Sequence, residues 1–354
     1  MKQFSFGLVS VFGLLATASP VPLARRLQLN DRASVTAAEV STLEFYAQYA
    51  GSAYCNSEVA VGTAITCSDD VCSSVEAAGA KVVATFNGDV TDIEGFVASD
   101  DTNKLIVASF RGSSSIRNWI ADLSFILVSC DLVSGCLTHA GFLTAYNEIA
   151  TDLLAALKTE VAAHPTYKIV FTGHSLGGAV ATLAAGYARK QGYAADLYTY
   201  GSPRVGNKAF VSYVTNQTGS EYRVTHLDDP VPRLPPIILD YRHTSPEYWL
   251  SDGTANTTDY TAADIKVCEG FANTNCNAGT SGLDVDAHLH YFEAISGCGA
   301  GGLSWKVKRD ATVTANVTSD MATTPYEAVS DADLQTRLDD WVAKDKEYAE
   351  GLDE

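Results

Sequence analysis

Basic side chains are scarce in this sequence. Lysine and arginine number 24 against 42 aspartates and glutamates, which gives a formal net charge of −18 at pH 7. Such a surface repels the phosphates of nucleic acids and of anionic membranes, so nucleic-acid binding is not expected. The first 33 residues are an exception, because they hold four basic groups and one acid. The N-terminal segment therefore differs in composition from the rest of the chain.

Long hydrophobic runs are also absent, apart from one near the N-terminus. Lys2 precedes an apolar stretch over residues 4–15 and the small-residue sequence Ala16-Thr17-Ala18, a pattern typical of a secretory signal peptide. The apolar stretch is too short to span a bilayer. We expect a signal peptide over residues 1–18, a propeptide over 19–33 that ends at basic cleavage points, secretion, and no integral membrane association.

Zinc-site spacing of histidine and cysteine is missing, and neither a metal nor an organic cofactor is expected. Eight cysteines in an exported chain indicate disulfides instead. Sequence proximity suggests three pairs and leaves a fourth that closes the central region: Cys67 with Cys72, Cys130 with Cys136, Cys268 with Cys276, and Cys55 with Cys298. Three Asn-x-Thr sequons are candidate glycosylation sites in a secreted protein: Asn216, Asn256 and Asn316.

Internal repeats are absent too, and strand and helix patterns alternate from residue 81 onward. Strands are expected over 81–86, 93–98, 103–110, 167–171, 197–200 and 222–226, and helices over 141–164, 179–189 and 207–218. This rhythm predicts an α/β fold with a mostly parallel central sheet flanked by helices.

The C-terminal residues 299–354 have a different composition, with twelve acids and six bases. A helix is expected over 331–352, capped by Ser330 and carrying a partial apolar stripe. We interpret the segment as an acidic extension of a catalytic domain at 34–298. The extension is either a solvated acidic tail lightly docked on that domain, or a processed or regulatory extension, as the basic cluster at 306–309 suggests.

The stretch Gly173-His174-Ser175-Leu176-Gly177 matches G-x-S-x-G between an expected strand and an expected helix, which makes Ser175 a candidate nucleophile. A serine hydroxyl needs an imidazole to take its proton and a carboxylate to orient that imidazole. The backbone N–H of Leu176, at a helix N-terminus, is a candidate donor to an oxyanion. Candidate partners follow later in the chain: Asp228 and Asp229 after a strand, then His243, His288 and His290, whereas His226 precedes the acids.

Five motifs together resemble the secreted filamentous-fungal class 3 lipases over residues 34–298: FTGHSLGGA, YGSPRVGN at 200–207, DPVPRLPP at 229–236, HTSPEYW at 243–249 and DAHLHYF at 286–292. The resemblance implies an α/β-hydrolase fold with a short helical lid. It also implies that Ser175 is the nucleophile, Asp229 the acid and His288 the base. Ser113 would be the second oxyanion donor beside Leu176, and the family's end-joining disulfide matches Cys55 with Cys298.

Residues 116–123, next to the expected oxyanion turn, carry apolar side chains at helical spacing: Ile116, Trp119, Ile120 and Leu123. A core-packed helix has the same pattern, but its position favours a lid that opens at a lipid interface. The lid region departs from the family at Ser114 and at residues 126–128, which affects lid energetics and chain-length preference.

The resulting hypothesis is a monomeric, secreted triacylglycerol lipase that hydrolyses lipid esters at an oil–water interface through an acyl-serine intermediate. Alternatives are a feruloyl-type carboxylesterase, side activity as a phospholipase A1 or galactolipase, and a silent lipid-binding protein that keeps the fold. The apolar lid argues against the feruloyl-type esterase, and the three intact triad residues argue against the silent protein.

Overall fold

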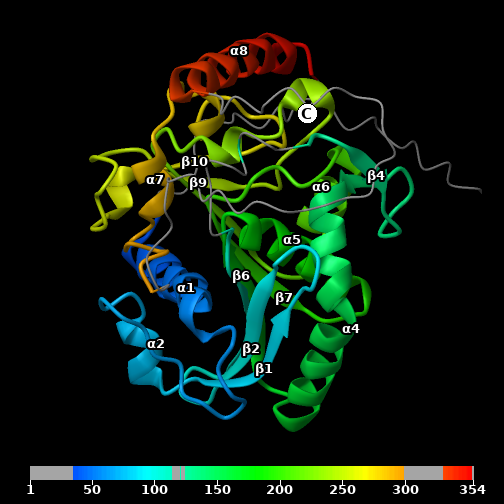
Figure 1. The fold of residues 1–354 in the computed structure, drawn as a ribbon, viewed down its shortest axis with the longest axis vertical. Helices are drawn as coiled ribbons and strands as arrows, with labels where there is room; N and C mark the ends of the chain where they lie inside the picture. Colours follow the sequence, from blue (N-terminus) through cyan, green and yellow to red (C-terminus); the bar gives the residue numbers. More distant parts are fainter. Residues whose placement is uncertain (1–34, 114–119, 121–123, 299–329, 353–354) are drawn as a thin grey trace, which may run out of the picture. The chain divides into compact units, whose positions relative to one another are not determined.

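The computed structural model describes residues 35–113, 120, 124–298 and 330–352 (Figure 1). The expected signal peptide and propeptide lie outside the described residues. So do three of the four expected lid residues, namely Ile116, Trp119 and Leu123, and the sequon at Asn316. Among the helices that are described, none combines the length and the apolar character needed to cross a bilayer.

A central sheet organises the described chain, and its strand order is β1-β2-β3-β6-β7-β8-β9-β10. The pairs from β3 through β9 are parallel, whereas β1, β2 and β10 add antiparallel strands at the two edges. The mostly parallel α/β sheet predicted from the sequence is therefore confirmed. The strands are β1 (Lys81–Asn87), β2 (Glu94–Asp100), β3 (Leu105–Phe110), β6 (Lys168–His174), β7 (Ala195–Tyr200), β8 (Glu221–His226), β9 (Glu247–Leu250) and β10 (Ile265–Cys268).

Helices cover both faces of this sheet (Figure 1). One face packs against α1 (Ala37–Asn56), and the other against α4 (Ala140–Ala163), α5 (Leu176–Lys190) and α6 (Lys208–Thr215). Alternation along β3 divides the core, since Ile106 and Phe110 join the cluster beneath α4 and α5 while Val107 joins the cluster beneath α1. The sheet is thus buried on both sides, as parallel sheets require.

Several elements were not expected from the sequence, among them α1, β9 and β10. Helix α1 begins at a capping box in which Thr36 and Glu39 exchange hydrogen bonds, yet so many of its positions are buried that it lacks an amphipathic stripe. Strands β9 and β10 are only four residues long each, too short for a periodic signal. Helix boundaries also move: α5 starts before the alanine-rich run, and α6 ends at Thr215.

Shorter elements complete the described chain and connect the sheet to the site. They are α2 (Ser73–Ala78), α7 (Val285–Leu289), the ribbon β4 (Leu127–Ser129) with β5 (Leu137–His139), and the 3₁₀ turns η1 (Val231–Arg233), η2 (Ile237–Leu239), η3 (Ala262–Asp264) and η4 (Asn277–Gly279).

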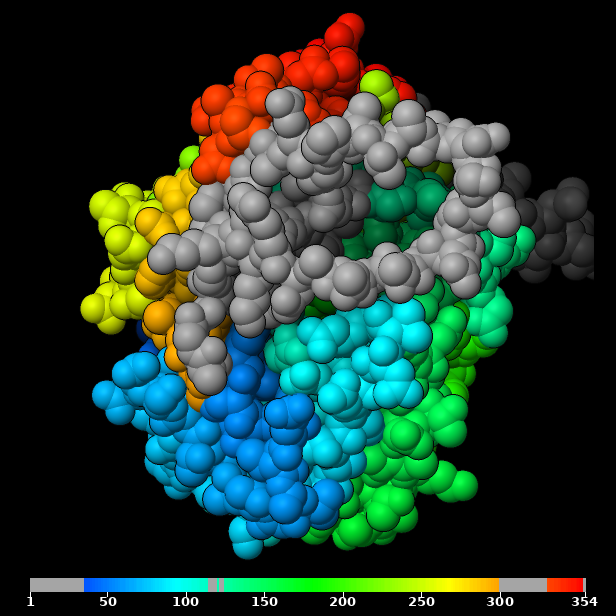
Figure 2. Space-filling view, viewed as in Figure 1, coloured from blue at the N-terminus to red at the C-terminus, as the bar shows by residue number. Residues whose placement is uncertain are grey.

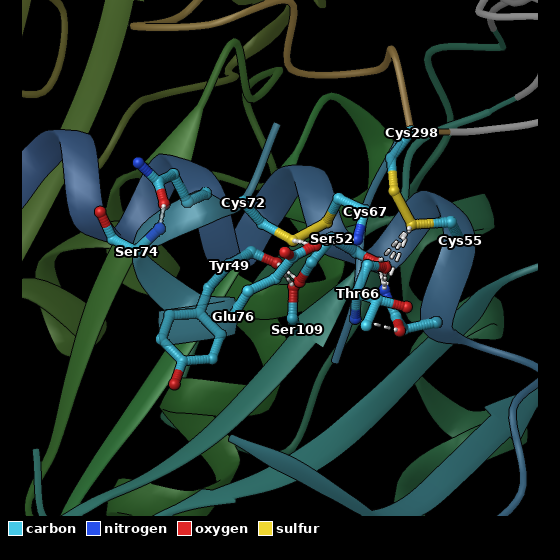
Figure 3. The surroundings of a disulfide bond; sticks show 12 residues. Tyr49, Ser52, Cys55, Thr66, Cys67, Cys72, Ser74, Glu76, Ser109 and Cys298 are labelled. Atoms are coloured by element: carbon cyan, nitrogen blue, oxygen red, sulfur yellow. Dashed lines mark hydrogen bonds between the residues drawn. A yellow bond between two sulfur atoms is a disulfide. The ribbon is translucent and has the colours of Figure 1, made fainter. Parts of the chain in front are cut away.

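The eight cysteines form four disulfides, and the pairs are those indicated by sequence proximity: Cys55–Cys298, Cys67–Cys72, Cys130–Cys136 and Cys268–Cys276. Figure 3 shows the first two bridges side by side, with the Glu76 carboxylate accepting from the Cys67 N–H at 2.6 Å. Cys55 and Cys298 are 243 positions apart, and closing so long a loop stabilises the fold by about 5 kcal/mol in the chain-entropy model.

The C-terminal extension forms helix α8 (Asp331–Glu350), which is capped by Ser330 as the sequence indicates. Its inner face buries Leu334, Leu338 and Val342 against the rest of the chain. The described part of the extension is therefore packed on the catalytic body.

Candidate active site

Ser175 lies on a sharp turn between β6 and α5. Its φ of 57° and ψ of −128° are strained for a residue with a side chain, as expected at a nucleophile elbow. The flanking glycines are required by space. A Cβ on Gly173 would lie 2.4 Å from the Gly177 carbonyl oxygen, and one on Gly177 would lie 2.0 Å from the Phe110 carbonyl oxygen. The glycine spacing of the motif therefore has a steric cause.

Asp229 and His288 are 59 positions apart and meet next to this turn, since the ring centroid of His288 lies 4.5 Å from that of His174, the residue before Ser175. Asp229 follows β8, and His288 lies on α7. The His288 Nδ1–H donates to Asp229 Oδ2 at 2.8 Å, and both side chains are fully buried. The Val231 N–H donates to Asp229 Oδ1 at 2.8 Å, and the Tyr291 hydroxyl donates to Oδ2. The carboxylate is thus fixed by three donors and orients the imidazole.

The second imidazole nitrogen of His288, Nε2, is buried and has no hydrogen-bond partner among the described residues. A buried polar atom without a partner is uncommon and often marks a functional site. Ser175 is also nearly inaccessible, at 2% exposure. No hydrogen bond joins Ser175 Oγ to Nε2 among the described residues, and catalytic hydrogen bonds often form only once substrate binds. With Nδ1–H donating to Asp229, Nε2 keeps its lone pair and can accept a proton.

Two backbone segments border the nucleophile where an oxyanion would form. Leu176 is the first residue of α5, so its N–H has no acceptor within the helix and points along the positive end of the helix dipole. The turn after β3 also lies close to Ser175, because a Cβ on Gly112 would come within 2.9 Å of Ser175 Cβ. Ser113 is the next residue in this turn.

A chain of hydrogen bonds connects this turn to the base. The Gly112 N–H donates to the Tyr54 hydroxyl at 3.0 Å, and that hydroxyl donates to His174 Nδ1 at 2.7 Å. The His174 Nε2–H then donates to the His288 carbonyl oxygen at 2.9 Å. Burial, followed by the neighbouring His288, holds the pKa of His174 well below its usual range, so this imidazole stays neutral.

The other candidates from the sequence have different partners. His243 Nε2 and His290 Nδ1 each pair with a backbone carbonyl, and His226 lies between a carbonyl and the Tyr260 hydroxyl. Asp228 is half-buried, which raises the pKa of its carboxyl, and its carbonyl accepts from Arg233. None of these four side chains contacts the Asp229–His288 pair through a hydrogen bond recorded for the described residues.

Sequence reasoning did not identify Tyr54, Tyr291 or the structural role of His174. His174 lies inside the G-x-S-x-G motif, so its position was available as a signal. Tyr291 likewise lies inside the DAHLHYF motif, but its partner Asp229 is 62 positions away. Tyr54 had no sequence signal, because its partner His174 is 120 positions away.

Ile120 is the one described residue of the expected lid. It is 4% exposed and shares a buried apolar cluster with Val231, Leu234 and Leu338. Val231 comes two residues after Asp229, so Ile120 lies close to the loop that bears the candidate acid. The sequons at Asn216 and Asn256 are on the surface, where a glycan could be attached.

Candidate metal ligands cluster in two places among the described residues, and both clusters consist largely of disulfide cysteines: Cys55, Cys67 and Cys298, and Cys67, Cys72 and Glu76. A sulfur already bonded to another sulfur is not a thiolate ligand. Neither cluster includes a residue of the Ser175 turn.

The chain is similar to proteins of one family. A family model described as lipase (class 3) matches residues 107–239. The secreted mono- and diacylglycerol lipase 1 of Fusarium solani is 51% identical over 304 residues, which cover 84% of this chain and 91% of that protein. The secreted mono- and diacylglycerol lipase A of Penicillium cyclopium is 40% identical over 314 residues, or 86% of this chain and 99% of that one. A crystal structure of a mono- and diacylglycerol lipase from Aspergillus oryzae superposes with a TM-score of 0.70 at 42% identity, over 75% of this chain and 99% of that chain. The chain therefore belongs to the class 3 lipases and has their α/β-hydrolase fold.

Proposed function

We propose that this protein is a secreted lipase that hydrolyses mono- and diacylglycerols, with Ser175 as nucleophile, His288 as base and Asp229 as the orienting acid. The observation that carries the assignment is the fully buried Asp229–His288 pair, which lies next to the turn where a serine is held at positive φ. The names of the Fusarium and Penicillium relatives supply the secretion and the substrate class. The four disulfides agree with an oxidising, extracellular setting.

Acylation begins when Ser175 Oγ attacks the ester carbonyl carbon and gives its proton to His288 Nε2. Negative charge then develops on the former carbonyl oxygen, to which we expect the Leu176 N–H and Ser113 to donate. The Asp229 carboxylate stabilises the imidazolium that forms. The hydrogen bonds from Val231 and Tyr291 keep this carboxylate in position.

Collapse of this intermediate breaks the bond to the glycerol oxygen, which takes the proton from His288 and leaves as an alcohol. A water molecule then attacks the acyl-serine ester. His288 takes one proton from that water and returns it to Ser175 Oγ as the fatty acid departs. Every proton passes through Nε2, the imidazole nitrogen that is not engaged with Asp229.

The lid expected over residues 116–123 is part of this proposal. Burial of Ile120 with Val231 and Leu234 supports it, because an apolar residue seated on the acid-bearing loop would cover the site in a closed state. Movement of Ile120 away from the cluster would expose apolar surface to lipid, which favours binding at an interface.

We propose mono- and diacylglycerols as the substrates, in place of the triacylglycerol of the sequence-based hypothesis. Two relatives that match at least 84% of this chain are both named for mono- and diacylglycerols. The four expected lid residues are all apolar, so the feruloyl-type alternative, with its soluble aromatic substrate, is not favoured.

The decisive experiment compares fatty-acid release from emulsified monoolein, diolein and triolein, and product release from phosphatidylcholine vesicles and methyl ferulate. We expect monoolein and diolein to be hydrolysed fastest. Ser175→Ala should lower kcat by roughly 10⁶-fold, whereas Ser74→Ala, at an exposed position on α2, should leave it unchanged. Glyceride hydrolysis that survives in Ser175→Ala would overturn the assignment. Triolein cleaved as fast as diolein would overturn the substrate preference alone.

A further inference from the structure

We infer that helix α8 contributes to catalysis by holding the triad in position. Asp345 and Asp339 on this helix are the positioning residues. This inference rests on the proposed function. Two loops carry the candidate acid and base: residues 227–240, which we call the acid loop, and residues 277–288, which we call the base loop. Helix α8 holds both of them. In Figure 2 this helix (red) lies on the surface of the molecule.

Asp345 accepts hydrogen bonds from the acid loop. Its carboxylate is 3% exposed, although it belongs to a helix on the surface. The N–H groups of Ile237 and Ile238, at the start of η2, donate to it at 2.8 and 2.9 Å. A carboxylate that accepts the free N–H groups at the start of a helical turn fixes where that turn begins.

The same carboxylate pairs with Arg204, which lies just beyond β7 and is 1% exposed. Arg204 Nη1 donates to Asp345 Oδ2 at 3.3 Å and to the carbonyl oxygens of Arg233 and Pro235. Burial lowers the pKa of Arg204 to about 10, and Asp345 is the largest influence in the opposite direction. The body of the enzyme therefore buries a guanidinium whose ion-pair partner comes from the C-terminal extension.

Asp339 accepts a hydrogen bond from the base loop. Its Oδ1 accepts from the Gly282 N–H at 2.9 Å, six residues before His288. The two loops are also joined to each other, because Arg233 Nη2 donates to the carbonyl oxygens of Asp228 at 3.0 Å and Gly282 at 2.6 Å. Helix α8 is thus hydrogen-bonded to both the acid loop and the base loop. The separation of these two loops sets the geometry of the Asp229–His288 hydrogen bond.

Apolar contacts also hold α8 against the acid loop. Leu338, one turn before Val342 on α8, is 1% exposed in the cluster that contains Val231 and Leu234 of the acid loop. Trp341 packs beside this cluster and contacts the Phe125 ring edge-on at 5.1 Å. The position of α8 is therefore fixed by burial as well as by charge, and loss of Asp345 would loosen the acid loop without removing the helix.

The test measures how fast Ser175 reacts with diethyl 4-nitrophenyl phosphate, a small soluble probe whose phosphoryl group is transferred to Oγ with release of 4-nitrophenolate. The rate is normalised to folded protein by circular dichroism well below the Tm. Because misplacement of a triad by about 1 Å costs up to about 100-fold in rate, we expect Asp345→Asn and Asp345→Ala to react at least about 10-fold more slowly. Asp339→Ala should show a smaller decrease.

The matched control is Asp340→Asn, one position from Asp339, because Asp340 is exposed and pairs only with Lys344 on α8 among its recorded contacts in the described chain. Its rate should equal that of the parent enzyme. A purely structural role for α8 would lower the Tm of the Asp345 variants but leave their rate per folded molecule unchanged, and that result would overturn the inference. Asp345→Asn decides the matter if Asp345→Ala does not fold. Reaction of Ser175→Ala with the probe would instead refute the proposed function.

Discussion

Tyr291 donates its hydroxyl hydrogen to Asp229 Oδ2, the same carboxylate oxygen that accepts the Nδ1–H of His288. Burial, followed by Asp229 itself, raises the pKa of the Tyr291 hydroxyl well above its ordinary value, so it remains a donor throughout the working pH range. The negative charge of the buried Asp229 carboxylate is therefore stabilised by the Tyr291 phenol as well as by the His288 imidazole.

Tyr291→Phe should destabilise the enzyme, since it removes one of the three donors to a buried charge. We expect a loss of about 1–3 kcal/mol in the free energy of unfolding. Activity on a soluble ester should fall far less than in Asp229→Asn, where the tautomer of His288 is no longer fixed and kcat drops by about 10⁴-fold.

Denaturant unfolding and initial rates check this prediction. Tyr241→Phe is the control, because the Tyr241 hydroxyl is buried without a hydrogen-bond partner in the described chain, so its removal should be neutral or stabilising. Equal stability of Tyr291→Phe and Tyr241→Phe would contradict the role given to Tyr291.

Tyr54→Phe should slow catalysis without weakening substrate binding. The Tyr54 hydroxyl connects the Gly112 N–H to His174, and His174 in turn donates to the carbonyl of His288. Its loss leaves the turn that carries Ser113 and the base-bearing α7 free to shift independently. We expect kcat on 4-nitrophenyl butyrate to fall by about 10-fold to 100-fold with little change in KM.

Tyr260→Phe provides the comparison for this experiment. It also removes a hydroxyl that is hydrogen-bonded to a histidine, in this case His226 Nε2 at 2.7 Å, but His226 has no recorded hydrogen bond to the Ser113 turn within the described residues. If both variants lose kcat equally, the connection through Tyr54 has no special role.

The nucleophile turn could be predicted from the sequence because its determinants are local. Gly173 and Gly177 are two positions from Ser175, and the flanking strand and helix have clear patterns. The choice of Asp229 over Asp228 was not local. Both follow β8, and only the resemblance to the lipases favoured the one whose carboxylate meets His288 in the folded chain.

Contacts between distant segments had no sequence signal. The pair of Tyr54 and His174 spans 120 positions, and the pair of Arg204 and Asp345 spans 141. The acidic composition of residues 299–354 suggests a solvated tail, yet one of its acids is the counter-ion of a buried arginine. Composition reports the average exposure of a segment, whereas these roles depend on which single side chain faces inward.

Glu221 gives a prediction about pH and stability. It opens β8, and burial raises the pKa of its carboxyl to about 7, an effect only partly offset by the nearby Thr244 and by Arg189, whose Nη1 lies 3.9 Å away. In the unfolded chain the pKa of this carboxyl is near its ordinary value of 4.5, so the proton is released there at lower pH. Between these two values the folded state holds more protons than the unfolded state, so the free energy of unfolding falls as pH rises and levels off above about pH 7.

Glu221→Gln should remove this loss, because an amide does not ionise and Arg189 keeps its hydrogen bonds to the carbonyls of Ala195, Val214 and Ser220. The difference in unfolding free energy between variant and parent should therefore shift by about 3 kcal/mol in favour of the variant between pH 4.5 and 7.5. Urea unfolding with the disulfides intact, measured across that range, tests it. Glu58→Gln, at an exposed position, should follow the parent at every pH. A difference for Glu221→Gln that stays constant with pH would show that the buried carboxylate is already ionised in the folded enzyme, and that Arg189 compensates its charge fully.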